Sequence, residues 1–203
     1  MTDLAPDRRA LLRAGFTLEW ITLGWNAVGV MVLAVLALSS ASVALAGFGL
    51  DSLVEIGAST VVIWELSGTG EHRQRIALRL IGAAFVGLAG YLLVQTVVAL
   101  VGGHRPDGSV GGIIWTGITA ATMFILAALK ARTGRALGNP VLQKEGSVTM
   151  IDGLLACAVL VGVFLNTVLG WWWADSVATL VIVYYAIREA VEIFRETSAG
   201  IST

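Results

Sequence analysis

Charged residues, histidine and cysteine are all scarce in this chain. Of its 203 residues, 13% are charged and 57% are hydrophobic, whereas soluble domains carry about 25% charged residues. So few charges cannot cover a surface in water, which indicates an integral membrane protein with several spans. One cysteine, Cys157, excludes an internal disulfide or a cysteine metal cluster, and two histidines argue against a histidine-rich metal site.

An excess of positive charge is also missing. The chain has 13 Lys and Arg against 14 Asp and Glu, which argues against nucleic acid as a partner, because phosphate binding needs a basic surface. There is no Walker-type GKS/T sequence and no glycine-rich dinucleotide loop, so nothing supports ATP as the energy source. The opening segment 1–16 is too polar for a secretory signal peptide, so we expect the first hydrophobic run to remain as a span.

Six hydrophobic segments are long enough to cross a bilayer, which takes about 20 mainly apolar residues. They are the segments 15–39, 42–66, 77–102, 110–131, 142–167 and 171–194. We expect each to be helical, because lipid offers no partner to unpaired backbone groups. Since the connections are short, the sequence predicts a single all-α domain over residues 1–203, a bundle of six transmembrane helices.

The basic residues predict the orientation of this bundle. Twelve of the 13 fall on one side, and Arg105 falls on the other. The twelve are Arg8, Arg9, Arg13, Arg73, Arg75, Arg79, Lys130, Arg132, Arg135, Lys144, Arg188 and Arg195. By the positive-inside rule both termini are cytoplasmic, and the run 171–173 of three tryptophans belongs to the aromatic belt of the opposite face. Compactness and the missing signal peptide favour a multi-pass protein of a bacterial-type inner membrane.

Acidic residues inside the predicted spans are the main functional signal. Asp51, Glu55 and Asp152 lie well within spans, and Glu19 and Asn26 are outer candidates. A carboxylate in a span costs a few kcal/mol and is therefore a functional hypothesis by default. The sequence places no Lys or Arg in the core of a span, so metal ions or protons are expected to balance these charges. Acids near the span ends, Glu189 and Glu192 among them, are expected to be solvated.

The spacing of the three central acids allows them to converge. Asp51 and Glu55 are four residues apart, so they share one helix face about 6 Å apart along the axis. At about 1.5 Å per residue, Glu55 and Asp152 lie roughly 16 Å and 15 Å from the cytoplasmic ends of their spans. If the two spans are neighbours, three carboxylates can point at one divalent cation. The alternative is that each acid is protonated or hydrogen-bonds a neighbouring helix.

These residues also carry a family resemblance. The segment SVALAGFGLDSLVEIGAS resembles the second span of the cation diffusion facilitator family, KEGSVTMIDGLLACAVLVG its fifth, and LGWWWADSVATLVIVYYAIREA its sixth. The resemblance assigns metal binding to Asp51, Glu55 and Asp152, and it matches Asp175 to an acid that more simply caps a helix. It implies export of divalent transition-metal ions, commonly Zn²⁺, coupled to inward proton movement, often by homodimers, which here would form through the spans.

The chain departs from the family pattern at two points. The partner of Asp152, usually His or Asp, falls on Val148, and Asn26, Thr149, Glu145, Glu19 or water could fill the gap. Glu145, seven residues before Asp152, is either an entry ligand or a solvated acid at the helix end. Without imidazole or thiolate the site is harder than usual for zinc, which leaves Mn²⁺ or Fe²⁺ open. The family's usual cytoplasmic domain would follow the sixth span, but the sequence runs only to Thr203, so we expect a short form without that domain.

The hypothesis is therefore a secondary transporter and not an enzyme. It would need no permanent cofactor, because the divalent metal and the protons are its cargo. The first alternative is a membrane protein that binds metal for sensing or assembly without transporting it. An intramembrane hydrolase using an acid pair is a weaker alternative, since the chain has no Ser/His or histidine-based metal constellation.

Overall fold

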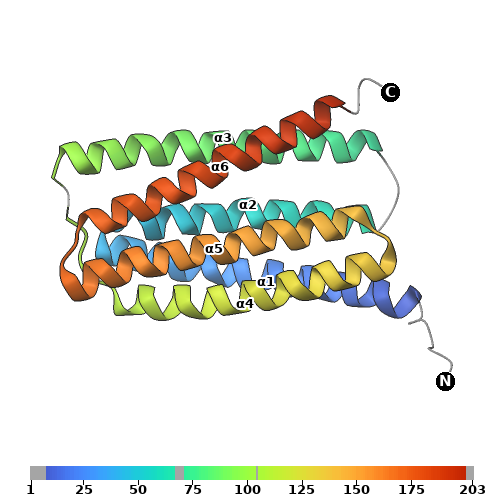
Figure 1. Ribbon diagram of the computed structural model, residues 1–203, viewed down its shortest axis with the longest axis horizontal. Coiled ribbons are helices and arrows are strands. Elements are labelled where there is room, and N and C mark those ends of the chain that lie inside the picture. Colours follow the sequence, from blue (N-terminus) through green and yellow to red (C-terminus); the bar gives the residue numbers. More distant parts are fainter. Residues whose placement is uncertain (1–7, 67–70, 104, 200–203) are drawn as a thin grey trace.

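Six long helices make up the computed structural model, which describes residues 8–66, 71–103 and 105–199, and these residues contain no strand (Figure 1). The helices are α1 (Arg8–Ser40), α2 (Val43–Leu66), α3 (Glu71–Val101), α4 (Val110–Leu137), α5 (Pro140–Leu169) and α6 (Trp173–Ala199). The predicted six-helix bundle is thus confirmed.

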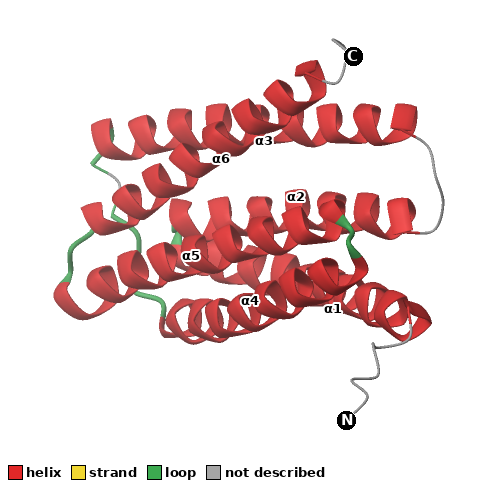
Figure 2. Ribbon diagram, turned by 45° about the vertical axis from the view of Figure 1, so that its right-hand side comes forward, coloured by secondary structure: helices red, strands yellow, loops and turns green. Residues whose placement is uncertain are grey.

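The helices lie side by side, with the start of α1 and the end of α6 at the same end of the bundle (Figure 1). Three pairs pack most extensively, namely α4 with α5, α1 with α2, and α3 with α6. Helix α6 runs obliquely between α5 and α3, so that α2, α5 and α6 all contact one another (Figures 1 and 2). This arrangement brings the acid-bearing helices α2 and α5 together, as the sequence required.

Helix bounds differ from the predicted spans mainly at the end that carries the termini. Helix α1 begins at Arg8 and not near residue 15, and α4 continues to Leu137 beyond residue 131. At the opposite end the bounds agree within about two residues. The apolar stretch marks only the part of a helix that lies in lipid, and the polar turns beyond it can stay helical in water. This extension matters for Lys130, as described below.

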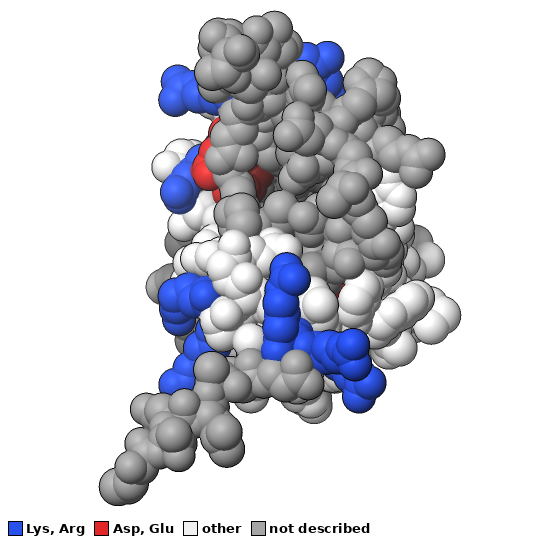
Figure 3. Space-filling view, turned by 90° about the vertical axis from the view of Figure 1, so that its right-hand side faces the viewer, with Lys and Arg blue, Asp and Glu red and all other residues white. Residues whose placement is uncertain are grey.

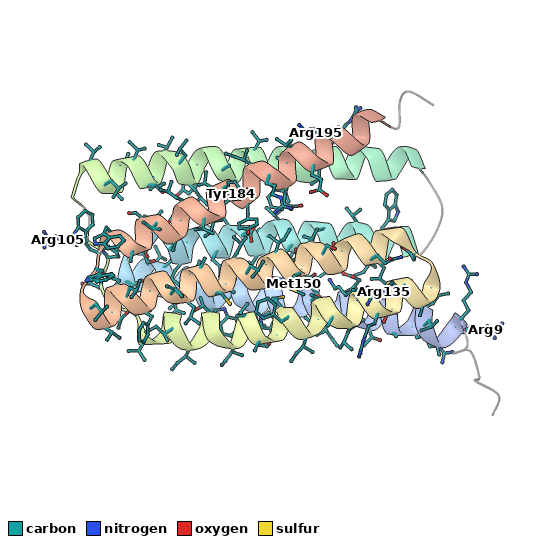
Figure 4. All side chains as sticks on the ribbon, in the orientation of Figure 1. Arg9, Arg105, Arg135, Met150, Tyr184 and Arg195 are labelled. Carbon is teal, nitrogen blue, oxygen red and sulfur yellow. The ribbon has the colours of Figure 1, made fainter. Side chains whose placement is uncertain are left out.

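The charge asymmetry is visible in the structure. Arg9, Arg135 and Arg195 lie at the end that carries both termini, and Arg105 lies at the other (Figure 4). Figure 3 looks onto the first end and shows Lys and Arg side chains at several places around it. At the other end, Arg105 lies over the ring of Trp172, 5.9 Å from its centroid. The positive-inside rule therefore predicts that the first end faces the cytoplasm.

Within the part of the chain that the structure describes, four helices are long and apolar enough to cross a membrane by themselves, in the segments Arg8–Ser40, Val43–Trp64, Val110–Leu137 and Glu145–Leu169. In α3 the apolar stretch is shorter, Phe85–Val101. Large apolar side chains are exposed on the outside of the bundle, Leu38 and Val101 each at 85%. Such a surface is suited to lipid and not to water.

Two glycines set how closely α5 approaches its neighbours. A Cβ at Gly162 would lie 2.6 Å from Ala178 Cβ, and one at Gly146 would lie 2.9 Å from the backbone nitrogen of Ala131. Small residues of this kind allow helix backbones to approach each other in membranes. They hold α5 against α6 on one side and against α4 on the other.

Asp175 is a helix cap, although of another helix than its own. Its carboxylate accepts hydrogen bonds from the Ser42 hydroxyl and from the backbone nitrogens of Val43 and Ala44, the latter two at 3.1 and 3.2 Å. These groups open α2, whose first N–H groups have no partner within the helix. The start of α6 is thereby fixed to the start of α2, one of the helices that carries the candidate site.

Candidate metal-binding site

Asp51, Glu55 and Asp152 line one small cavity of about 20 Å³ between α2, α3, α5 and α6. All three are buried, at 6%, 4% and 3% exposure. Their positions are near the middle of α2 and of α5. The sequence prediction that these carboxyl groups share one region at similar depth agrees with this placement.

The Asp152 carboxylate gives the clearest indication that a balancing charge belongs in the cavity. Both of its oxygens are buried and accept no hydrogen bond. Asp51 lines the same cavity from α2. Burying an ionised carboxylate without a partner is costly, so a proton or a cation must balance the charge here.

Glu55 is held in place by a contact with α5. Its Oε1 accepts a hydrogen bond of 3.1 Å from the Thr149 hydroxyl on α5. This bond ties α2 to α5 and fixes one Glu55 oxygen, while the side chain still lines the cavity. Among the described residues, no three acidic, histidine or cysteine side chains stand close enough to hold a metal in this conformation. Cation binding would therefore require the carboxylates to draw together.

Two further residues of the cavity bear on the sequence predictions. Val148, which stands at the position of a family ligand, does line the cavity. Glu189 of α6 lines it as well, and it is buried at 5% exposure. The expectation that Glu189 is solvated was wrong, because α6 packs against α2, α3 and α5 and this residue lies on its buried face.

The expectation that no basic residue lies in a span core was also wrong. Lys130 of α4 is fully buried. Its ammonium donates to Glu19 Oε2 at 3.1 Å, to Glu145 Oε1 at 3.2 Å and to the Thr149 hydroxyl at 3.1 Å. Helix α4 continues seven residues beyond it, about two turns. Lys130 therefore lies inside the bundle and not in a cytoplasmic loop.

This network gives other partners to the residues that we considered for the gap at Val148. Glu19 and Glu145 form ion pairs with Lys130, so Glu145 is not a solvated acid at the helix end. Thr149 connects Lys130 to Glu55. Asn26 donates to the backbone oxygen of Thr22 in its own helix, at 3.1 Å. None of these four side chains is in the lining of the cavity.

The sequence over residues 20–201 matches the profile of the cation efflux transmembrane domain. The chain belongs to the cation efflux family. A comparison with curated proteins finds no match. Because members of the cation efflux family carry metal cations across membranes, the chain is a multi-pass membrane transporter of metal cations and not an enzyme.

Proposed function

We propose that this cation efflux protein is a secondary transporter that exports a divalent transition-metal cation in exchange for protons. The observation that carries the proposal is the cavity at mid-depth, lined by Asp51, Glu55 and Asp152, where both Asp152 oxygens are buried without a hydrogen-bond donor. Such a carboxylate cannot stay ionised without a cation. Within the described residues, no basic side chain lines the cavity, so the balancing charge comes from outside.

Metal and proton compete for the same oxygens. A divalent cation needs the carboxylates ionised, and its departure leaves charges that protons can neutralise. Alternating access then follows if the cavity opens to the cytoplasm when it can take metal and to the outside when it can take protons. Zn²⁺ is the usual cargo implied by the family resemblance, and the oxygen-only donor set also suits Mn²⁺ and Fe²⁺.

The test is uptake of Zn²⁺, Mn²⁺ and Fe²⁺ into proteoliposomes under an imposed pH gradient. We expect flux of at least one ion that depends on the gradient. Asp51→Asn, Glu55→Gln and Asp152→Asn should each reduce it to near background, since each removes an anionic oxygen and keeps the shape. Glu192→Gln is the matched control, because this residue of α6 lies outside the cavity lining.

Two outcomes would contradict the proposal. Normal flux in Asp152→Asn, with loss only in the two α2 variants, would remove α5 from the site. Metal binding without flux of any ion in sealed vesicles would instead favour a sensor or an assembly protein. Size-exclusion profiles of the variants distinguish loss of function from loss of fold. We expect the fold to survive, because a neutral amide is cheaper to bury than an unpaired carboxylate.

A further inference from the structure

Four carboxyl groups line the cavity, and one of them is outside the set that the sequence predicted. Besides Asp51, Glu55 and Asp152 there is Glu189, from α6, with 5% of its surface exposed. Glu189 and Asp51 line this cavity from α6 and α2. The cavity is therefore bounded by acids from three helices.

The side chain that faces this cavity from α5, one turn before Asp152, is apolar. Val148 lines the cavity and offers no ligand atom. A cation held by Asp51, Glu55 and Asp152 alone would lack a protein ligand on that side of the cavity. Glu189 shares the cavity with Val148 and carries the carboxylate that Val148 cannot provide.

We infer that Glu189 is the fourth protein ligand of the transported cation and replaces the ligand absent at Val148, an inference that rests on the proposed function. The donor set is then four carboxylates on α2, α5 and α6. Asp152, whose two buried oxygens accept no hydrogen bond, independently indicates that a cation or proton belongs in this cavity. An all-oxygen set of this kind favours a hard divalent ion. The preference for Mn²⁺ over Zn²⁺ is therefore greater than in a site that contains imidazole.

A ligand on α6 also has a consequence for coupling. Asp175 fixes the start of α6 to the start of α2, and Gly162 of α5 allows α6 to approach closely. When the carboxylates draw together on a cation, Glu189 pulls the middle of α6 toward α2 and α5. The bound ion would thereby connect α2, α5 and α6 through its ligands.

The test is Mn²⁺ binding to the purified full chain, followed by the electron paramagnetic resonance signal of free Mn²⁺. We expect Glu189→Gln to weaken binding about tenfold or more, because even groups that only orient ligands cost about 10–100-fold when removed. Glu192→Gln, three residues further along α6 and outside the cavity lining, should leave the affinity unchanged. Val148→Asp combined with Glu189→Gln should restore most of the lost affinity, since a carboxylate returns to the cavity from α5.

The outcomes separate the two claims. If Asp51→Asn and Asp152→Asn lose Mn²⁺ binding while Glu189→Gln binds as the wild type does, the inference on Glu189 is overturned and the proposed function stands. If none of the three variants changes binding, the site itself is refuted. If Glu189→Gln lowers affinity and Val148→Asp does not restore it, Glu189 acts on the fold and not as a ligand, which also overturns the inference. Zn²⁺ competition in the wild type should require more Zn²⁺ than in Val148→His.

Discussion

Replacing Lys130 by methionine should destabilise the bundle severely. Lys130→Met keeps the length of the side chain and removes the ammonium that pairs with Glu19 and Glu145. Both carboxylates are buried, at 0% and 5% exposure. Removing one partner of a buried ion pair costs about 3–5 kcal/mol, because the remaining charge is left uncompensated. Two stranded carboxylates place the expected loss in the free energy of unfolding at the upper end of that range.

The same reasoning predicts that the loss can be reversed without restoring a charge. Adding Glu19→Gln and Glu145→Gln to Lys130→Met removes the stranded charges, and replacing a whole buried ionic cluster with neutral groups is often close to neutral. We expect the triple variant to regain most of the lost stability. Arg132→Met, at an exposed position on the same helix, is the control and should change stability by less than about 0.5 kcal/mol.

Thermal and denaturant unfolding in detergent micelles at neutral pH would measure these differences. Two results would refute the reasoning. One is an unfolding free energy of Lys130→Met equal to that of the wild type, which would mean that the carboxylates are already neutral. The other is a triple variant no more stable than Lys130→Met, which would mean that lost packing and not stranded charge explains the effect.

Three further predictions follow from the fold and the site. Val148→His should tighten Zn²⁺ binding in calorimetric titration because imidazole suits zinc, and unfolding without a change in affinity would show that the side chain does not face the cation. Asp175→Ala should lower the free energy of unfolding by about 1–3 kcal/mol, since it leaves buried donors at the start of α2 unpaired; unchanged thermal stability would contradict its role as a cap. In a Cys157→Ala background, an impermeant thiol reagent should label Arg135→Cys in inside-out vesicles only and Arg105→Cys in right-side-out vesicles only. Labelling of both from one side would overturn the orientation.

Much of the bundle was predictable because lipid imposes simple rules on the sequence. The apolar stretches located all six helices, and the basic residues located the end where both termini lie. The acids in the middle of α2 and α5 stood out because a carboxylate in an apolar stretch has few structural explanations. The spacing of Asp51 and Glu55 placed them on one face without any knowledge of the neighbouring helices.

Lys130 and Glu189 could not be placed in the same way. Both fall near the end of an apolar stretch, where the hydropathy pattern predicts that a charged side chain is solvated. Lys130 is inside because α4 continues to Leu137, and the surrounding polar turns hide this from a count of apolar residues. Glu189 is inside because it follows Ile182 by seven residues, two turns along the buried face of α6. Which face of α6 is buried depends on its crossing with α2 and α5, and that is a property of the tertiary structure.

The buried charges divide into groups with different surroundings, and this division supports the proposed site of cation exchange. Among the described residues, seven acids are buried against one basic residue, Lys130. Glu19 and Glu145 have a permanent cation in Lys130, and Asp175 has the backbone donors of α2. The remaining four acids line one cavity, whose lining contains no Lys or Arg among the residues that the structure describes, and Thr149 links one of these acids, Glu55, to Lys130. A covalently attached cation cannot leave, so we expect the Lys130 cluster to stabilise the fold in every state, while the proposed transport site would take up and release its cations from solution.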